Sequence, residues 1–221
     1  MDSIAQVLGS AIHAFAALMV QEDGITESVL VEKLKKSWNL IDPQEGWVSK
    51  TSQEKAIAMI TRFMKYHMKH EREIVGVELG FDVTVGKARI RGTVDRLEVD
   101  SAGNLFVIDF KTSKTPISYE KAEQNLQLKS YQIAVAEGGF TAHHASTTPS
   151  GAALVYLGHD VQKISSREQG VINLEEARAE IENIAQSMGA AQFVAATNSR
   201  CKECPVKSSC PIKAEGRTVI E

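Results

Sequence analysis

The sequence predicts a mixed α/β fold, with a central mixed β-sheet flanked by helices. Apolar residues recur at helical spacing near the N-terminus, a β-favouring stretch follows, and the remainder alternates between helical and strand patterns. The 221 residues are 43% hydrophobic, enough to bury one sizeable core. We expect one domain with a helical part over residues 1–70, a core over 71–195 and a cysteine-bearing tail over 196–221.

Three helices are predicted in the N-terminal part. The first carries an apolar stripe of Ile4, Leu8, Ile12, Phe15 and Met19. Thr26 is a candidate N-cap for a second helix that runs through Trp38. The segment 51–54 reads Thr-Ser-Gln-Glu, which has the spacing of a capping box, so a third helix is expected from there to about residue 70.

The middle of the chain has the pattern of an antiparallel meander. Residues 75–99 are rich in Val, Ile and Leu and partly alternate, and residues 100–104 have turn chemistry. The apolar run 105–110 predicts a central strand buried on both faces. We expect a helix over 120–137, a polar surface loop over 141–151, a strand over 152–157 and a long helix over 173–188.

Charge and hydropathy limit the possible functions. The net charge of -3 gives no overall attraction to nucleic acid, so local lysine clusters would have to supply it. No apolar run approaches the roughly 20 residues that span a bilayer, and no signal-peptide pattern is present, so we expect a cytoplasmic protein without a membrane partner.

Asp95, Asp109 and Lys111 form the candidate catalytic cluster. Strand alternation points Asp109 and Lys111 to one face, and Asp95 lies on the preceding strand across a tight turn. Two ionised carboxylates repel each other, and a hard cation such as Mg²⁺ or Mn²⁺ relieves that cost. The set suits phosphodiester hydrolysis, in which a metal activates water and Lys111 positions it. A surface salt bridge is the alternative.

The motifs around this cluster resemble a known family. Residues 92–96 (Gly-Thr-Val-Asp-Arg) and 107–112 (Val-Ile-Asp-Phe-Lys-Thr) look like the PD-(D/E)XK nuclease core in its RecB-like form. Residues 8–13, ending in His13, resemble its N-terminal helix, and residues 127–131 resemble its Q-x-x-x-Y motif. The resemblance implies a restriction-endonuclease-like core.

The resemblance also assigns roles to single residues. It implies that the metal ligands are His13, Asp95, Asp109 and the backbone carbonyl of Phe110. It adds Gln127 and Tyr131 to the catalytic set of Asp95, Asp109 and Lys111; four residues apart on a helix, the two share a face. Glu78 lies on a strand leading into the site, where it either contacts a second metal or belongs to a solvated strand face.

The three cysteines form a separate candidate site. Cys201, Cys204 and Cys210 have C-x₂-C-x₅-C spacing, which favours a shared metal or cluster over a disulfide framework. Zinc could take a fourth ligand from His143, His144 or His159, and three reduced thiols are the alternative. The resemblance implies instead a [4Fe-4S] cluster whose fourth cysteine precedes His13 in a longer polypeptide, so this chain holds three of the four cysteines.

The resemblance implies a metal-dependent DNA exonuclease that processes ends in recombination and repair. Its substrate would be single-stranded DNA ends. Its partner would be a helicase or motor domain or subunit, as in UvrD/RecB/AddB-type helicase-nucleases, and this chain would be a domain excised from such a protein. Two alternatives stay open. One is a catalytically silent DNA-binding scaffold, and the other is a stand-alone CRISPR-associated nuclease that trims spacer DNA.

Overall fold

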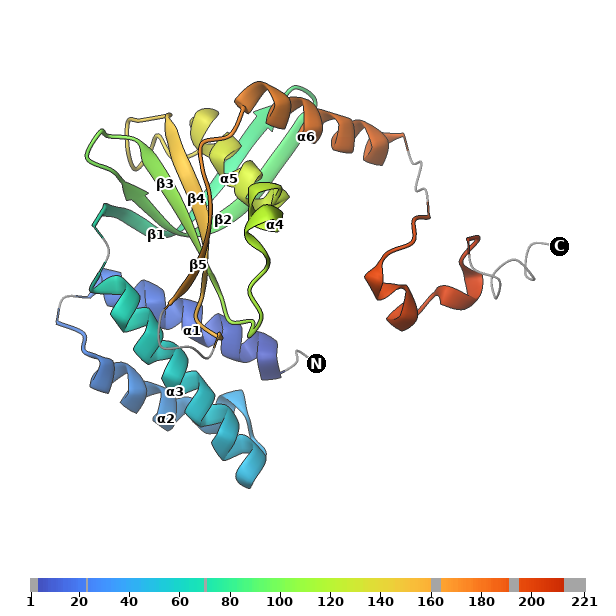
Figure 1. Ribbon diagram of the computed structural model, residues 1–221. Coiled ribbons are helices and arrows are strands. Elements are labelled where there is room, and N and C mark those ends of the chain that lie inside the picture. The colour runs from blue at the N-terminus through green and yellow to red at the C-terminus, as the bar shows by residue number, and fades with distance from the viewer. Residues whose placement is uncertain (1–3, 23, 70, 160–163, 191–194, 213–221) are drawn as a thin grey trace.

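The molecule consists of a five-stranded sheet between two helical layers, as Figure 1 shows for the computed structural model. The structure describes residues 4–22, 24–69, 71–159, 164–190 and 195–212. None of the helices in these ranges is long and apolar enough to cross a membrane. The mixed α/β class predicted from the sequence is confirmed.

Three N-terminal helices form the layer below the sheet in Figure 1. They are α1 (Ile4–Gln21), α2 (Glu27–Ile41) and α3 (Trp47–His67). Thr26 caps α2 as predicted, because its side-chain oxygen accepts a hydrogen bond from Val29 N, but the helix continues past Trp38. The expected end of α3 near residue 70 falls three residues too late, and residue 70 itself lies outside the described ranges.

The predicted capping box at residues 51–54 is wrong. Helix α3 already begins at Trp47, and the hydroxyl of Thr51 donates a 2.9 Å hydrogen bond back to the carbonyl of Trp47. Ser52 does the same to the carbonyl of Val48. Hydroxyl side chains inside a helix can bond to the carbonyl four residues earlier, so the motif spacing alone does not locate the helix start.

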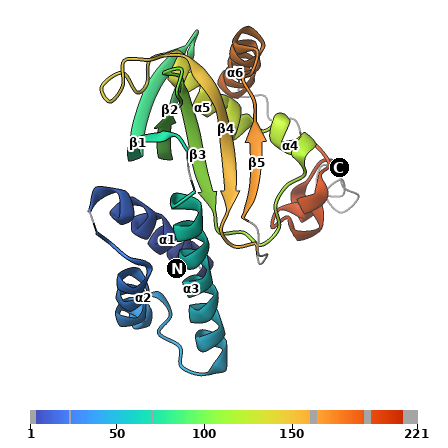
Figure 2. The same cartoon turned by 60° about the vertical axis from the view of Figure 1, so that its left-hand side comes forward.

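The sheet has the strand order β1-β2-β3-β4-β5. Its strands are β1 (Glu73–Val85), β2 (Ala88–Val99), β3 (Leu105–Lys111), β4 (Pro149–Tyr156) and β5 (Ser165–Gln169). The first three strands form the predicted antiparallel meander, and β3 is central and pairs in parallel with β4. Strands β3, β4 and β5 run side by side in Figure 2. Strand β5 was not predicted, because Ser-Ser-Arg-Glu-Gln carries no apolar alternation.

The remaining helices are α4 (Tyr119–Glu123), α5 (Leu126–Ala136) and α6 (Leu174–Gly189). The prediction of a single helix over 120–137 is therefore wrong, because Gln124 and Asn125 interrupt the helix. The side chain of Asn125 accepts a hydrogen bond from Leu128 N and starts α5 as a new helix. The polar loop expected over 141–151 is shorter than predicted, since β4 already begins at Pro149.

Strand β3 separates two apolar cores because its side chains alternate between the faces of the sheet. Leu105 and Val107 pack in the core that contains α5. Phe106, Ile108 and Phe110 pack in the other core, against α1, α2 and α3. This double burial explains the near-continuous apolar run of β3 and confirms its predicted central position.

A buried ion pair lies between β2 and α3. Arg96 and Glu98 are 0% and 1% exposed, and Arg96 Nη2 lies 2.8 Å from Glu98 Oε1. The guanidinium of Arg96 also lies over the rings of Tyr66 and Phe110, at 5.1 and 5.5 Å from their centres. Burial of two charges is tolerated only while both are paired. Both charges belong to β2, and the Arg96 guanidinium contacts α3 through the ring of Tyr66.

We expect Arg96→Met to lower the free energy of unfolding by about 3–5 kcal/mol, because it leaves the Glu98 charge buried without its closest partner. Urea unfolding measures the loss. The control is Arg89→Gln, which removes an exposed pair with Asp82 and should have a much smaller effect on the free energy of unfolding. Similar small losses in both variants would contradict a structural role for the buried pair.

Candidate functional site

The site lies where β2 separates from β3. The paired register of the two strands ends at Arg96 and Ile108. One position further on, the carboxylate of Asp95 accepts a 2.5 Å hydrogen bond from the backbone N–H of Phe110. The side chain thus replaces the missing strand partner for a backbone group that would otherwise be left unsatisfied. Asp95 is consequently held at the fork between the two strands.

Three acidic residues follow one another across the sheet at this fork. The pairs on either side, Val77 with Arg96 and Leu79 with Val94, place Glu78 opposite Asp95. The β2–β3 register places Asp109 at the position after Ile108, in line with Asp95. Residues opposite each other on adjacent strands share a face. The register alone therefore brings three carboxylates into one row.

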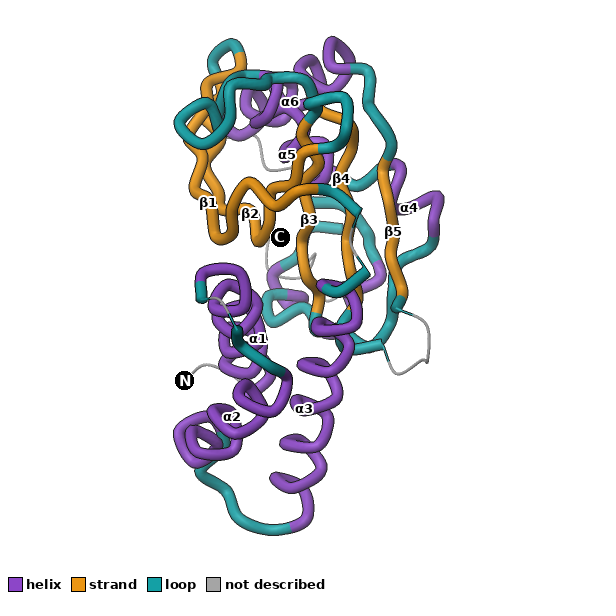
Figure 3. Tube along the Cα trace, turned by 90° about the vertical axis from the view of Figure 1, so that its left-hand side faces the viewer, coloured by secondary structure: helices purple, strands orange, loops and turns teal. Residues whose placement is uncertain are grey.

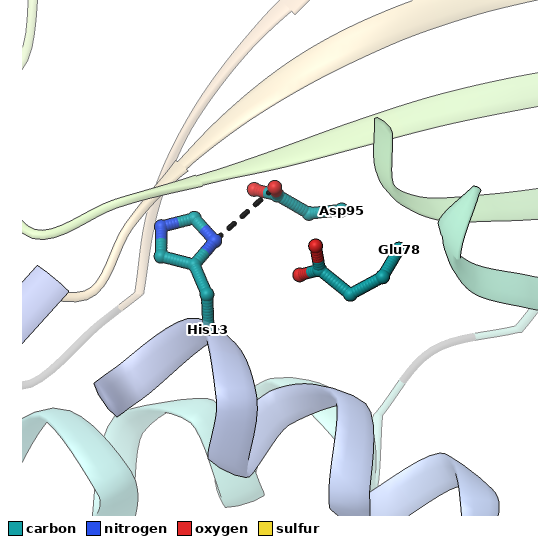
Figure 4. Close-up of side chains that lie close together, drawn as sticks. All are labelled: His13, Glu78 and Asp95. Atoms are coloured by element: carbon teal, nitrogen blue, oxygen red, sulfur yellow. Dashed lines mark ion pairs between the residues drawn. The ribbon is translucent and has the colours of Figure 1, made fainter. Parts of the chain in front are cut away.

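His13 reaches this row from α1, which lies next to the ends of β1 and β2 in Figure 3. Ile12 is buried in the helical core, and the next residue, His13, is left pointing toward the sheet. Its Nδ1 lies 3.1 Å from Asp95 Oδ1. Figure 4 shows His13, Glu78 and Asp95 pointing toward one another, and one ligand atom from each lies within 4.8 Å of the others.

The electrostatics of the row are unfavourable for three ionised acids. Burial, followed by the charge on Asp95, raises the pKa of Asp109. The same two causes raise the pKa of Glu78. The pKa of His13 is also raised, chiefly by its hydrogen bond to Asp95, and this outweighs the opposing effect of burial. The row therefore attracts positive charge, which protons or a metal ion can supply.

Lys111 and helix α5 hold the other end of the row. Lys111 Nζ lies 2.6 Å from Asp109 Oδ2 and donates to Gln127 Oε1 at 3.0 Å. The amide nitrogen of Gln127 donates to Asp109 Oδ1 at 2.8 Å, and the hydroxyl of Tyr131 donates to the same oxygen at 2.9 Å. Burial and the charge on Asp109 raise the pKa of Tyr131, so it stays a neutral donor. The lysine is oriented by two partners.

The structure thus brings together all six side chains that the motifs singled out. They are His13, Asp95, Asp109, Lys111, Gln127 and Tyr131. The ring of Phe110 points away from them and packs edge-on against Phe63, at 5.2 Å between ring centres. Only its backbone faces the site, in keeping with the role that the resemblance gives it. The roles of these residues remain predictions.

Glu78 has a stronger connection to the site than its sequence context indicated. It is exposed, as a solvated strand face requires, yet its carboxylate joins the His13–Asp95 group. Its backbone has φ of 50°, a left-handed conformation that non-glycine residues rarely adopt. Such strain is maintained only where surrounding structure imposes it, often at functional sites. The signal available in the sequence was an acidic residue on the strand before the one that carries Asp95.

The donor set suits a hard divalent cation. Mg²⁺ and Mn²⁺ prefer oxygen ligands, and His13 adds one nitrogen. With metal–oxygen bonds of about 2.1 Å, ligands lie within about 4.2 Å of each other, so small side-chain rotations from the observed group are sufficient. Among the residues that the structure describes, His13, Glu78 and Asp95 are the one such group of three or more. A metal held there would lie in the row that continues to Asp109.

The cysteines lie away from this site. Cys201 lies in the short helix η1 (Ser199–Glu203). Cys204 directly follows η1, and Cys210 directly follows η2 (Lys207–Ser209). Figure 1 shows this segment standing apart from the sheet. All three are half-buried free thiols, and within the described ranges they do not converge as a metal-binding group. The cluster therefore stays a prediction. Of the tail predicted over residues 196–221, residues 213–221 lie outside the described ranges.

Comparison with known proteins assigns the chain to a family. The model described as the PD-(D/E)XK nuclease superfamily matches residues 1–211. The crystal structure of SSO0001 covers 94% of this chain and 95% of its own, at 17% identity and a TM-score of 0.37. A second structure, described as a "Putative exonuclease" from Eubacterium rectale, covers 93% and 80%, at 13% identity and a TM-score of 0.46. No curated protein matches.

We expect Mn²⁺ to raise the thermal unfolding temperature, because a ligand that binds only the folded state stabilises it by about 2.7 kcal/mol at 100 times its dissociation constant. Glu78→Gln and Asp95→Asn should each reduce this shift, since both carboxylates belong to the proposed ligand group. Glu73→Gln, an exposed position on the same strand β1, is the matched control. A shift of equal size in all four proteins would place the metal elsewhere.

We also expect the effect of His13→Gln on stability to depend on pH in the absence of metal. The folded-state pKa of His13 is raised, so its contribution is complete below pH 6.5 and disappears as the pH rises through the folded-state value. Unfolding in EDTA should show a loss of about 1 kcal/mol at pH 6, as for a partly exposed pair, and a smaller loss at pH 9. The opposite trend would contradict the His13–Asp95 ion pair.

Proposed function

The chain belongs to the PD-(D/E)XK nuclease superfamily, and we propose that it is a Mg²⁺- or Mn²⁺-dependent deoxyribonuclease that shortens DNA from its ends. The observation that carries the proposal is the juxtaposition of Lys111 with the row of Glu78, Asp95 and Asp109. Carboxylates, a histidine and an oriented ammonium are the groups that phosphodiester hydrolysis with a metal requires.

The proposed ligands are His13, Asp95, Asp109 and the carbonyl of Phe110, with Glu78 added by the geometry of the group. When bound, the metal ion lowers the pKa of a coordinated water and stabilises charge on the leaving oxygen. For Asp109 to bind a metal, one of its oxygens must turn from its present partners. Gln127 and Tyr131 both donate to Asp109 Oδ1. The other oxygen, Asp109 Oδ2, is held by Lys111 and is therefore the one that can turn toward a metal.

Lys111 is placed to position water or phosphate. An ammonium group has three N–H donors, and Asp109 and Gln127 engage two of them. Its side chain is 31% exposed, so the third donor can reach a ligand from solvent. A preorganised donor aimed at developing negative charge needs little reorganisation during the reaction. Gln127 acts as a positioning residue, because its amide holds both Lys111 and Asp109.

The proposed setting is end processing in recombination and repair, with single-stranded DNA ends as the substrate. Support comes from the order of the RecB-like motifs along the chain. A helicase or motor domain or subunit would supply the unwound strand, since the sequence contains no G-x₄-G-K-[ST] phosphate-binding loop. The cysteine tail would bind a [4Fe-4S] cluster together with a fourth ligand, and none of its three cysteines is joined in a disulfide.

Cleavage of end-labelled single- and double-stranded DNA tests the proposal. We expect cutting with Mn²⁺ or Mg²⁺ and none with EDTA, with products that shorten progressively from an end. Lys111→Ala should lower the rate by about 10²-fold or more, as for loss of a preorganised donor to developing negative charge. The absence of cutting with either metal would instead favour the DNA-binding scaffold.

Gln127→Ala should lower the cleavage rate less than Lys111→Ala, by about tenfold, because it removes orientation and leaves the ammonium in place. Ser130→Ala is the matched control on the same helix, since its hydroxyl bonds only to the carbonyl of Leu126 among the contacts described. Equal rates for Gln127→Ala and Ser130→Ala would show that Gln127 has no positioning role.

A further inference from the structure

A pocket of about 500 Å³ lies between α3 and the ends of β3 and β4. Its charged lining consists of Lys55, Arg62, Lys114 and Glu54, joined by His159. Three cationic side chains thus face one carboxylate. Lys55 and Arg62 lie on α3 and Lys114 follows β3, so the fold and not a run in the sequence brings the positive charges together.

The pocket adjoins the backbone of Lys111. The amides of Leu157 and Gly158 both donate to the carbonyl of Lys111, at 2.8 and 3.3 Å, and Gly158 lines the pocket. A Cβ at position 158 would lie 1.9 Å from the carbonyl oxygen of Thr112, so only glycine permits this close approach. The two segments that leave the ends of β3 and β4 are therefore fixed against each other between the pocket and Lys111.

The residues of the pocket differ in how firmly they are held. Arg62 Nη1 donates to the carbonyl of Leu157 at 2.8 Å, which ties α3 to the end of β4. Lys55 and Lys114 are exposed and can turn toward a ligand. Nδ1 of His159 is buried and has no hydrogen-bond partner among the residues described. The pocket thus offers one fixed cation, two adjustable cations and an imidazole.

We propose that this pocket binds a phosphate group of the DNA strand that the site cleaves, an inference that rests on the proposed nuclease function. The overall charge of -3 gives the protein no general attraction to DNA, so local cationic sites must supply it. Lysine and arginine contacts to phosphate position a nucleic acid without reading its sequence. A phosphate anchored here would hold the strand at a fixed place relative to Lys111.

Binding of single-stranded oligonucleotides in EDTA tests the pocket without cleavage. We expect Lys55→Gln/Lys114→Gln to weaken binding by about tenfold at low salt and to reduce the slope of log K against log salt by about 0.7, the value for one phosphate. The charge-matched control is Lys33→Gln/Lys36→Gln, two exposed positions on α2. Equal affinity and slope in the two double variants would overturn the proposal.

Glu54→Gln provides a test of opposite sign. Removing the one carboxylate that lines the pocket should strengthen DNA binding, which loss of structure would not do. Thermal unfolding checks that all variants fold, and Lys114→Gln alone serves if the double variant does not. Unchanged or weaker binding by a folded Glu54→Gln protein would also count against the pocket.

The ends of the oligonucleotide identify which phosphate is held. If the pocket variant loses affinity only for a strand with a 5′- or 3′-terminal phosphate, the ligand is that phosphomonoester. If the loss is equal for strands with hydroxyl ends, the ligand is an internal phosphodiester. Both results support the pocket. If the parent protein binds DNA through Lys55 and Lys114 but does not cut it, the proposed nuclease function is refuted and DNA binding by the pocket stands. If the protein cuts DNA but its DNA binding does not depend on these two lysines, the pocket proposal alone is refuted.

Discussion

Repulsion among three carboxylates at the fork between β2 and β3 is the constraint on which the arrangement depends. Two like charges about 5 Å apart repel by about 3 kcal/mol at an effective dielectric of about 20, before exposure to solvent reduces it. Burial, and after it the charge on Asp95, raises the pKa values of Glu78 and Asp109, so repulsion is the second cause of both shifts. His13 pairs with Asp95 in the middle of the row and Lys111 pairs with Asp109 at its end, so the fold supplies positive partners to two of the three carboxylates.

The same strands that carry this unfavourable row also carry the best-buried parts of the core. On β3, Asp109 and Lys111 face the site, while Ile108 and Phe110, which alternate with them along the strand, are buried against the N-terminal helices. The hydrogen bond from Phe110 N to Asp95 joins the two sides directly. Apolar burial on one face of β3 thus maintains the positions of charges on the other, which would not stay close without it.

Features that local interactions determine could be predicted from the sequence, and features that depend on contacts between distant residues could not. Local periodicity and turn chemistry predicted the two strands and the turn within residues 92–112 correctly. The roles of Asp95, Asp109 and Lys111 on these strands stay predictions. The break at Gln124 and Asn125 was missed, because the two helical segments are both compatible with a continuous pattern and only the Asn125 cap separates them. Strand β5 was missed because pairing with β4, and not its own composition, makes it a strand. The place of Glu78 in the site depends on the register between β1 and β2 and on its left-handed backbone conformation, which no local sequence pattern encodes.

Lys111 links the chemistry of the row to the rest of the protein in two directions. Its side chain is held by Asp109 and Gln127, which connects it to α5, and its carbonyl accepts from Leu157 and Gly158, which connects it to β4. Gly158 in turn belongs to the wall of the cationic pocket. A strand of DNA that contacts both places would therefore be held by one continuous, hydrogen-bonded part of the fold. Fixed spacing between an anchoring charge and a reacting group lowers the entropic cost of bringing a substrate into position. The fork where β2 leaves β3 provides room for the row, and the parallel pairing of β3 with β4 provides the rigidity.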